Sequence, residues 1–489
     1  MYRFDFQLAR SFIVHSHREA FVAGNERLSY RDLTHMALGI IAKLEEQCPD
    51  QRLVAVVNRG DGATYAALLA CWFSGRGYVP LEADDPPARI GEILEQSGAN
   101  AVLVSSNLPL PGLPTDALVM TTAGLRVVGM FDVVANPTAI AYVLFTSGST
   151  GVPKAVPIRF SNLNALFAAL DGEGFGHSPH DRWLQMARLS FDLSILSFVP
   201  CWLSGGTLCL PSKEGPKYLA ILQLIEAEQL TVLPMVPSVL KLLRPFTAEI
   251  SHKHVRCVIL GGEPFPEALA HEWAFCFPHA QFFNFYGPTE GTIVTTIYRL
   301  ERGSGARNLS SNGILAIGKP LWPDNVCVLN AQGQEAREGE LHLCGPMLFS
   351  GYLNAAVPLI DYDGQQWYPT GDRVREAEDG QLLFLGRIDR QVQIEGHRVE
   401  PGELESVVAS LTGLTAVAFT TTHQHFDSQR IVLVLESPNP PPASLAEQLK
   451  QRLPARLLPT IIHTTPKLPR TADNAIDLPT LRSQFEAKQ

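Results

Sequence analysis

Short apolar runs recur along this chain, and longer amphipathic segments separate them. The runs are bounded by glycine, proline and other turn formers, which is typical of strands buried within a sheet. They cover residues 53–57, 101–104, 141–145, 255–260 and 282–285. Their alternation with helical stretches predicts an α/β fold in which helices cover both faces of the sheets. Because ligands bind beyond the carboxyl ends of strands in such sheets, we expect the functional residues in the turns after these runs.

The pattern changes near Asp389, beyond which we predict a smaller α+β unit. Its expected elements are a strand over 391–394, a turn at Gly396, an amphipathic helix, strands over 416–419 and 431–435, and a helix over 444–453. The amphipathic helix is indicated by apolar residues at the spacing i, i+3, i+4, i+7, namely Leu404, Val407, Val408 and Leu411. The sequence therefore predicts two domains, a large one over residues 1–388 and a small one over residues 389–489.

Composition narrows the class of protein. At 489 residues, of which 46% are hydrophobic, the chain is long enough for more than one buried core. A formal net charge of -10 gives no support to a nucleic-acid partner, which would favour a basic surface. We expect neither a membrane span nor a secretory signal, because no long apolar run and no charged-then-apolar start is present. The eight cysteines form no Cys-x-x-Cys pair, and we interpret them as reduced core thiols of a cytoplasmic protein.

A polar, glycine-containing turn follows the apolar run at 141–145. It places four hydroxyl side chains and two glycines within residues 146–151, with a lysine shortly afterwards. Glycines let backbone N–H groups converge on an anion, hydroxyls add donors, and lysine adds a point charge. We interpret the segment as a phosphate-binding loop formed by Thr146, Ser147, Gly148, Ser149, Thr150 and Lys154. Prolines at 153 and 157 flank the lysine, so no helix begins there and the P-loop of NTPases is excluded.

Six further segments, in order along the chain, carry a resemblance to a known family. They are residues 28–33, 77–81, 284–290, 339–352, 368–372 and 386–389. With the phosphate loop, they resemble the motifs of the adenylate-forming superfamily, which includes acyl-CoA synthetases, luciferases and adenylation domains of nonribosomal peptide synthetases. The resemblance covers nearly the whole chain. It implies a large multi-sheet N-terminal domain and a small, mobile C-terminal domain.

The resemblance also implies roles for residues of these motifs. In adenylation, a carboxylate attacks the α-phosphate of ATP and releases pyrophosphate. By resemblance, Glu290 binds Mg²⁺ and Thr289 contacts the α-phosphate, while Asp372 accepts hydrogen bonds from the ribose beside its cationic companion Arg387. Tyr286 would stack on the adenine. The other expected nucleotide-binding residues are Gly262, Glu263, Asn284 and Phe384.

The substrate can be approached in the same way. Asp192 lies in a segment, 191–194, that resembles the motif whose aspartate pairs with the α-amino group of an amino acid. A buried ammonium group requires a charge partner, so Asp192 favours an amino-acid substrate. The pocket positions implied by the resemblance are all apolar apart from the glycine: Leu193, Leu196, Pro234, Ile259, Gly261, Phe285, Ile293 and Val294. Several are bulky, so glycine or alanine fits best, with proline or another small aliphatic amino acid as the alternative.

Two positions depart from the family pattern. The family places a lysine near its C-terminus that bridges the substrate carboxylate and the α-phosphate, and here that position holds Ala475. This is either an engineered substitution or a natural loss, and the matching flanking residues favour the former. Gln393 stands where many relatives carry a lysine that serves the thioester-forming state.

The sequence therefore predicts a free-standing ligase that activates an amino acid with ATP and Mg²⁺ and passes it to the phosphopantetheine thiol of a separate carrier protein. The wording of residues 191–194 also resembles D-alanine–carrier-protein ligases. An acyl-CoA synthetase is the alternative enzyme, against which Asp192 argues. A catalytically inactive protein that binds ATP and an amino acid is the alternative of another class, suggested by Ala475 alone.

Overall fold

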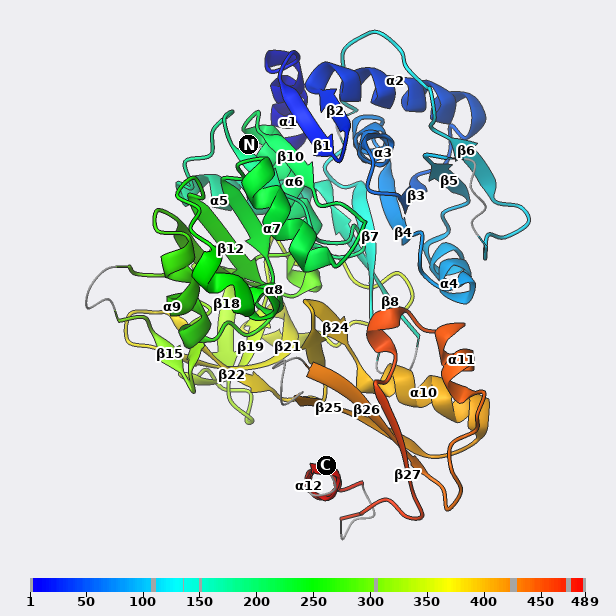
Figure 1. Ribbon diagram of the computed structural model, residues 1–489, viewed down its shortest axis with the longest axis vertical. Helices are drawn as coiled ribbons and strands as arrows, with labels where there is room; N and C mark the ends of the chain where they lie inside the picture. The colour runs from blue at the N-terminus through cyan, green and yellow to red at the C-terminus, as the bar shows by residue number, and fades with distance from the viewer. Residues whose placement is uncertain are drawn as a thin grey trace.

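The chain folds into a large N-terminal part built on three sheets and a small C-terminal part, which lies at the bottom of Figure 1 in orange and red. The computed structural model describes residues 3–106, 111–134, 136–148, 152–302, 307–422, 429–471 and 476–486. None of the helices it describes combines the length and apolarity that crossing a bilayer requires. All eight cysteines are free, and each of them except the half-buried Cys48 is buried.

The first sheet of the N-terminal part has six strands in the order β6-β5-β3-β4-β7-β8. Their bounds are β3 Leu53–Asn58, β4 Gly77–Glu82, β5 Ala101–Val104, β6 Leu118–Thr121, β7 Ile140–Thr146 and β8 Lys154–Arg159. All neighbours are parallel except β7 and β8. Strands β4 and β5 are buried along their whole length, as expected of parallel strands covered on both faces. The lysine of the phosphate loop begins strand β8 and no helix.

The second sheet has nine strands in the order β17-β14-β13-β12-β11-β9-β10-β1-β2. Its bounds are β1 Glu19–Ala23, β2 Glu26–Ser29, β9 Arg182–Leu184, β10 Thr207–Leu210, β11 Val232–Met235, β12 Cys257–Gly261, β13 Gln281–Tyr286, β14 Thr296–Arg299 and β17 Lys319–Pro320. Strands β11, β12 and β13 run parallel, so their carboxyl ends meet at one edge. The strand expected from residue 255 begins two residues later, at Cys257.

The third sheet, of five strands, is antiparallel, with β22 paired to β21 beside the path β18-β19-β21-β20. The bounds are β18 Val326–Leu329, β19 Glu338–Leu343, β20 Ile360–Tyr362, β21 Gln365–Glu376 and β22 Leu382–Arg387. A two-stranded ribbon, β15 Ser310–Ser311 with β16 Ile314–Leu315, lies in the preceding segment. Because β21 and β22 are antiparallel neighbours, Asp372 stands directly opposite Arg387.

The C-terminal part holds a hairpin, a three-stranded sheet and three helices. Its elements are β23 Val392–Ile394, β24 His397–Val399, α10 Pro401–Thr412, β25 Ala416–Thr422, β26 Gln429–Glu436, α11 Leu445–Lys450, β27 Ile461–Thr465 and α12 Leu478–Glu486. The expected amphipathic helix is α10, and its Leu404 and Val408 are buried in the small core. The helix expected over 444–453 is shorter, and Ser444 makes no side-chain cap because its own backbone is already helical.

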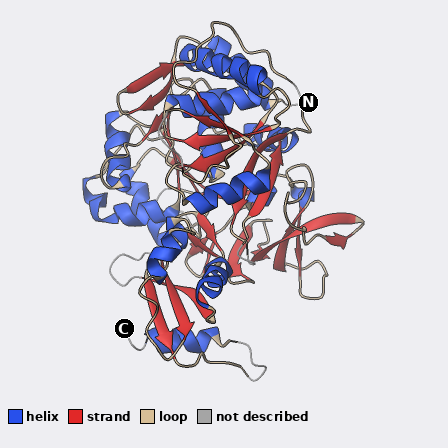
Figure 2. Cartoon of the chain, turned by 90° about the vertical axis from the view of Figure 1, so that its right-hand side faces the viewer, coloured by secondary structure: helices blue, strands red, loops and turns tan. Residues whose placement is uncertain are grey.

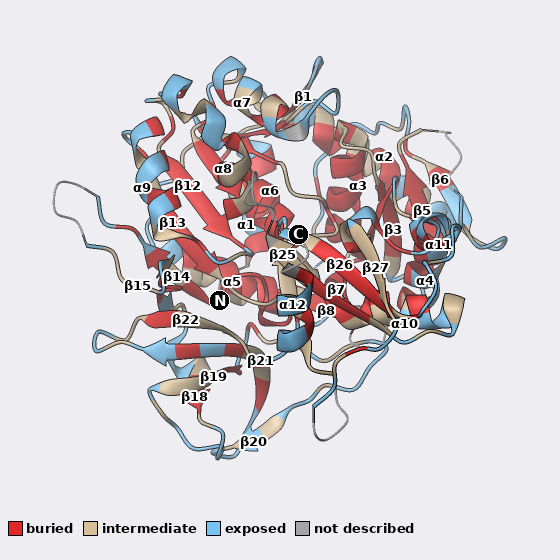
Figure 3. Ribbon diagram, turned by 60° about the horizontal axis from the view of Figure 1, so that its bottom comes forward, coloured by how far each residue is buried: buried red, intermediate tan, exposed pale blue. Residues whose placement is uncertain are grey.

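Helices surround the sheets of the upper part, as Figure 2 shows, and the strands between them form the buried interior in Figure 3. Their bounds are α1 Phe4–Val14, α2 Tyr30–Gln47, α3 Gly62–Phe73, α4 Pro87–Ser97, α5 Phe160–Gly172, α6 Leu193–Leu203, α7 Lys217–Ala227, α8 Pro237–Leu243 and α9 Glu267–Cys276. Within the segment 28–33, which carries part of the resemblance, Ser29 and Asp32 form a capping box at the start of α2. Short 3₁₀ turns include Thr289–Gly291 and Ala455–Leu457.

Candidate active site

A cavity of about 290 Å³ lies beyond the carboxyl ends of β7, β12 and β13. The turns after these three strands all reach it, as the apolar pattern led us to expect. The lining residues from these turns include Thr146, Ser147, Gly262, Glu263, Gly287 and Pro288. The fold thus brings strand ends from two different sheets to one site. The glycine-bearing turns that follow these strands lie far apart in the sequence but close together in space.

Residues of the C-terminal part close one side of this cavity. Gln393, Gly396, His397 and Arg398 all line it. Gly396 has a φ of +79°, and a Cβ atom built on it would lie 2.6 Å from Cγ1 of Val236, so the approach requires glycine. The N–H of Gly396 donates to Oε1 of Glu263 at 2.6 Å.

Glu263 was expected to contact the nucleotide, and it lines the cavity. Both of its carboxylate oxygens accept hydrogen bonds from the backbone in this structure. Oε2 accepts from the N–H of Ser238 at 2.7 Å, and Oε1 accepts from Gly396. Glu263 therefore joins the N-terminal part to the C-terminal part at the rim of the cavity.

Asp372, Arg387 and Tyr286 form one hydrogen-bonded group in the cavity wall. The Tyr286 hydroxyl donates to Oδ2 of Asp372 at 2.6 Å, and Nη1 of Arg387 donates to Oδ1 at 2.9 Å. Burial raises the pKa of Asp372, and the Arg387 charge and the tyrosine hydrogen bond oppose that rise. Phe384 and Asn284 line the same cavity, and Nδ2 of Asn284 donates to the carbonyl of Ala316.

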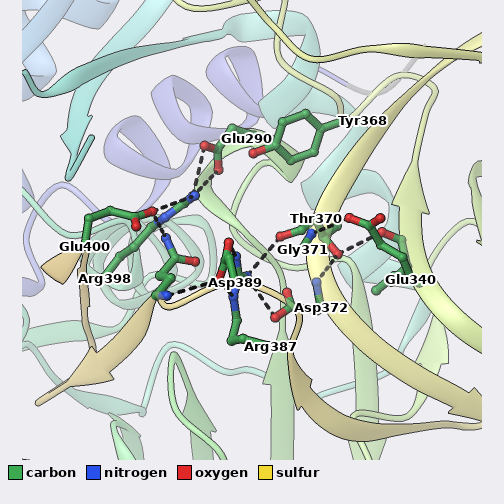
Figure 4. A network of polar contacts seen from close by, with 12 residues as sticks. Glu290, Glu340, Tyr368, Thr370, Gly371, Asp372, Arg387, Asp389, Arg398 and Glu400 are labelled. Atoms are coloured by element: carbon green, nitrogen blue, oxygen red, sulfur yellow. Dashed lines mark hydrogen bonds and ion pairs between the residues drawn. The ribbon is translucent and has the colours of Figure 1, made fainter. Parts of the chain in front are cut away.

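Glu290 lies at the centre of a second polar group, shown in Figure 4. Its side chain is fully buried, and Nη1 of Arg398 donates to both carboxylate oxygens, at 3.0 and 3.1 Å. The Tyr352 hydroxyl donates to Oε1 at 2.7 Å. Burial alone would raise the pKa of Glu290, but the Arg398 charge and the Tyr352 hydrogen bond outweigh it and hold the pKa below its usual value. Mg²⁺ prefers oxygen ligands and usually binds through one or two carboxylates together with substrate phosphates, so Glu290 could supply such a carboxylate. Arg398 lies on both of its oxygens here, and the described residues contain no group of three or more His, Cys, Asp or Glu side chains that could hold a metal ion.

Asp192 precedes the first residue of α6 and lines the cavity. Only 7% of the residue is exposed. Burial raises the pKa of Asp192 to about 7. The charge of Glu290 also raises this pKa, whereas a hydrogen bond with Thr289 lowers it. The carboxyl group is therefore poorly compensated as it stands, and a bound cation would stabilise its charged form.

The expected pocket residues divide into three sets. Five of them line the main cavity: Leu193, Leu196, Gly261, Phe285 and Ile293. Ile259 lines a second cavity of about 340 Å³, which also has Leu196 and Phe285 in its wall. The structure places the other two, Pro234 and Val294, among buried residues, outside the lining of both cavities.

The phosphate loop is described in part. Thr146 and Ser147 line the cavity, whereas Ser149 and Thr150 lie outside the described residues. Among the described residues, Oγ1 of Thr146 is a buried polar atom without a hydrogen-bond partner, which suits a ligand with acceptor oxygens. A Cβ atom on Gly148 would lie 1.9 Å from the carbonyl oxygen of Val152, so the loop closes tightly on itself there. Lys154 lies with Nζ 5.3 Å from the centre of the Tyr352 ring.

The position of the family lysine, Ala475, also lies outside the described residues. Its predicted role therefore stays a prediction. Arg470, shortly before it, pairs with Glu436 on β26, with Nη2 and Oε2 at 3.2 Å. Asp389, the predicted hinge, lies between β22 and β23 and accepts two hydrogen bonds from Arg387 and one from the N–H of Gln391.

Sequence reasoning missed several residues that the structure brings to the site, and two of them bear on Glu290. Arg398 lies on Glu290, and Tyr352 completes that group, although Tyr352 belongs to a segment that carried the resemblance. The predicted turn at Gly396 could have pointed to Arg398. Residues that directly follow a turn at the cavity also lie near the cavity. Nothing in the sequence indicated which side chain of that hairpin reaches Glu290.

Comparison with known proteins places these features in a family. A family model, that of the AMP-binding enzymes, matches residues 8–353. The chain belongs to this family of adenylate-forming ligases. Tyrocidine synthase 1 of Brevibacillus parabrevis is 31% identical over 482 residues, which cover 94% of this chain and 43% of that protein. The chain spans less than half the length of the curated relatives it matches.

Two solved structures of the AMP-binding enzymes extend the likeness to the whole chain. The Vibrio cholerae adenylation domain AlmE, in complex with glycyl-adenosine-5'-phosphate, has a TM-score of 0.85 and 26% identity, covering 99% of this chain and 98% of that one. Holo-PA1221, a nonribosomal peptide synthetase protein with adenylation and PCP domains, bound to a vinylsulfonamide inhibitor, has a TM-score of 0.83 and 25% identity, covering 99% of this chain and 84% of that one. The α/β fold with a large N-terminal and a small C-terminal part is therefore that of adenylation domains.

Proposed function

We propose that this AMP-binding enzyme activates a small apolar amino acid as aminoacyl-AMP and then transfers it to the phosphopantetheine thiol of a separate carrier protein. Glycine or alanine is the favoured substrate, and proline or another small aliphatic amino acid is the alternative. In the first step, a carboxylate oxygen of the amino acid forms a bond to the α-phosphorus of ATP, and the bond to pyrophosphate breaks. In the second step, the thiol loses its proton, its sulfur forms a bond to the aminoacyl carbonyl carbon, and the bond from that carbon to the phosphate oxygen of AMP breaks.

The buried carboxyl group of Asp192 is the observation that carries the amino-acid substrate. It lies 7% exposed at the start of α6, in a wall that is otherwise apolar around Leu193 and Leu196. Burial raises the pKa of Asp192 to about 7, and a hydrogen bond with Thr289 opposes only part of that rise. An α-ammonium group would supply that compensation, whereas a fatty or aromatic acid without an amino group would leave the carboxylate buried and unpaired.

The nucleotide end of the cavity supports ATP as the second substrate. Asp372 offers two acceptor oxygens at the place expected for ribose hydroxyls, and the ring of Tyr286 lies in the cavity wall beside it. Thr146 and Ser147 carry hydroxyl groups that could donate to phosphate oxygens, and Thr289, which we propose contacts the α-phosphate, lines the same cavity. A Mg²⁺ ion held by Glu290 would neutralise part of the triphosphate charge.

The size of the substrate follows from the side chains beyond Asp192. Leu193, Ile293 and Phe285 line the cavity there, and Phe285 is 5% exposed. These bulky apolar walls favour a small apolar side chain over a large or charged one. The glycyl-adenosine-5'-phosphate bound by the similar Vibrio cholerae domain supports a substrate at this small end of the range.

A carrier protein as acceptor is supported by the C-terminal residues at the cavity and by the holo-PA1221 relative, which contains a PCP domain beside its adenylation domain. A free CoA thiol is the alternative acceptor, as in acyl-CoA synthetases. Transfer from the adenylate to a phosphopantetheinylated carrier, compared with transfer to CoA at equal concentration, distinguishes them. Faster transfer to CoA would favour the synthetase.

Amino-acid-dependent exchange of pyrophosphate into ATP tests the proposal as a whole. We expect exchange with glycine or alanine above that with leucine or phenylalanine. Replacing Asp192 with alanine should reduce amino-acid-dependent exchange by about 10²–10⁴-fold, because breaking a buried ion pair costs roughly 3–5 kcal/mol. Nucleotide binding should persist. The exposed Asp50, replaced by asparagine, is the matched control and should leave exchange unchanged. Undiminished dependence on the amino acid in the Asp192 variant would refute the assignment.

A further inference from the structure

Arg398 occupies the place at which the metal ion is expected. Its Nη1 lies 3.0 and 3.1 Å from the two oxygens of Glu290, a carboxylate that is completely buried. A monovalent guanidinium group and a divalent ion cannot share these oxygens, because two cations a few ångströms apart in a buried site repel strongly. Either Arg398 or the metal ion therefore neutralises Glu290 at a given time.

The main chain of Arg398 engages the phosphate loop as well. The Ser147 hydroxyl donates to the carbonyl oxygen of Arg398 at 2.9 Å. A hydroxyl carries one proton, so Ser147 cannot donate to a phosphate oxygen while it makes this bond. A single residue of the C-terminal part thus satisfies both a proposed metal ligand and a proposed phosphate donor.

The surroundings of Arg398 hold it in this place. Nη2 lies 3.9 Å from Oε1 of Glu400, and that oxygen accepts a hydrogen bond from Nε2 of Gln391 at 2.8 Å, as the network in Figure 4 illustrates. The same hairpin is anchored through Gly396 to Glu263. These contacts fix the orientation of the guanidinium group when the C-terminal part is docked in this way.

We propose that Arg398 is a positioning residue that replaces the metal ion on Glu290 once pyrophosphate has left, so that metal binding and this docking of the C-terminal part exclude each other. The inference rests on the proposed function for the order of events. Without Arg398, departure of the metal ion would leave Glu290 buried and uncompensated, and such a charge strongly destabilises the arrangement around it. The exchange of one cation for another couples release of the first product to docking for the second step.

The test combines two measurements on the full chain, and neither depends on turnover. The first is binding of Mn²⁺, a paramagnetic substitute for Mg²⁺, followed by its electron spin resonance signal. The second is hydrogen exchange of the segment 392–399, which contains the Gly396 amide that donates to Glu263. The variants are Arg398→Met, which removes the charge, and Arg398→Lys, which keeps it. Arg452→Met, at an exposed arginine of the C-terminal part, is the matched control.

We expect Mn²⁺ to increase exchange of the segment 392–399 in the wild-type protein and in Arg452→Met. Arg398→Met should bind Mn²⁺ about tenfold more tightly, as follows if docking leaves roughly a tenth of the protein competent for the metal. In Arg398→Met, the segment 392–399 should undergo rapid hydrogen exchange with or without Mn²⁺. Arg398→Lys should restore part of the antagonism between Mn²⁺ binding and docking of the C-terminal part. Equal Mn²⁺ affinity in wild type and Arg398→Met would overturn the proposal. The proposal would also be overturned if Mn²⁺ bound to the wild-type protein and left hydrogen exchange of the segment 392–399 unchanged. That result does not depend on whether any variant folds.

These outcomes are separable from the fate of the proposed function. Antagonism between Mn²⁺ and docking, without pyrophosphate exchange for any amino acid, would sink the amino-acid assignment and leave the role of Arg398 intact. Suppose instead that pyrophosphate exchange depends on an amino acid but Mn²⁺ does not change hydrogen exchange of the segment 392–399. That result would support the proposed function and overturn the role of Arg398.

Discussion

At the scale of single residues, the site is organised by buried charges that are only partly compensated. Asp192, Glu290 and Asp372 are all buried carboxylates within one cavity wall or beside it. Glu290 and Asp372 each have an arginine partner, whereas Asp192 relies on hydrogen bonds. Buried charges without partners are unfavourable in a free protein. The wall at which we propose that a substrate ammonium group binds is therefore also a source of instability.

This leads to a prediction about pH and stability. Burial raises the pKa of Asp192 from 3.8 to about 7, so between these values the folded protein binds a proton that the unfolded chain has lost. The stability that the protonated Asp192 contributes to the folded protein is fully present below pH 3.8 and is lost as the pH rises through about 7. In the ligand-free protein, Asp192→Asn should therefore gain stability over wild type as the pH rises. The gain approaches about 4 kcal/mol at most, at about 1.4 kcal/mol for each pKa unit.

Urea unfolding at pH 5 and pH 8, in the absence of amino acid, measures the part of that gain that falls above pH 5, which is about 3 kcal/mol. Asp50→Asn, at an exposed carboxylate, should follow the wild-type profile at both values. A stability difference between Asp192→Asn and wild type that does not grow with pH would mean that Asp192 is already compensated in the free protein.

A second residue-scale prediction concerns the wall between the two cavities. Phe285 and Leu196 line both, so their side chains separate a space of about 290 Å³ from one of about 340 Å³. Phe285→Ala should join the two and raise exchange with leucine relative to glycine about tenfold or more, within the range that apolar pockets discriminate. Phe282→Ala, at a buried phenylalanine of the same strand that lines neither cavity, controls for lost packing. A shift of equal size in both variants would speak against a dividing wall.

At the scale of elements, the sequence was most informative where the pattern is local. The runs at 53–57, 101–104 and 141–145 became β3, β5 and β7 with ends displaced by at most one residue, because their burial on both faces demands continuous apolar residues. Pocket positions were harder. Ile293 lines the main cavity and its neighbour Val294 does not, a distinction of side-chain direction that apolarity alone does not reveal. Arg398 could not be identified, since its contact with Glu290 joins residues 108 positions apart across two parts of the fold.

The connection between β22 and β23 gives a prediction at this scale. We expect the C-terminal part to reorient about Asp389, because the two half-reactions require different groups at the same carboxylate. Asp389→Pro fixes φ near about −65° and removes an N–H group, so it should hold one orientation and depress one half-reaction more than the other. Pyrophosphate exchange and transfer of supplied aminoacyl-adenylate to the carrier report the two steps separately.

Asp389→Ala is the matched control for this substitution. It removes the hydrogen bonds that the carboxylate accepts from Arg387 and from Gln391 but leaves the backbone free to rotate. If the proline variant and the alanine variant lose the same amount in both half-reactions, the side-chain contacts matter and the hinge does not lie at Asp389.

At the scale of the whole molecule, the described arrangement has its C-terminal hairpin at the cavity and Arg398 on Glu290. Such docking satisfies Glu290 and Ser147 without a nucleotide, so it suits the step after pyrophosphate has gone. If the proposed function holds, we expect adenylation to use a second arrangement, in which other residues of the C-terminal part face the α-phosphate. The resemblance places a lysine in that role, at the position of Ala475, and the structure leaves the residue undescribed.

The last prediction follows from this need for a second arrangement. Ala475→Lys should raise amino-acid-dependent pyrophosphate exchange by about 10²–10³-fold, the usual effect of one preorganised group that stabilises developing charge. Transfer from supplied aminoacyl-adenylate should change little, because that step uses the docking described here. Lys467→Met and Arg470→Met serve as comparisons, and Arg470 is already paired with Glu436. If pyrophosphate exchange is already fast, does not change in Ala475→Lys and is lost in Lys467→Met or Arg470→Met, the role belongs to the residue replaced in that variant. Absence of exchange in every form, with ATP and amino acid still bound, would favour an inactive binding protein.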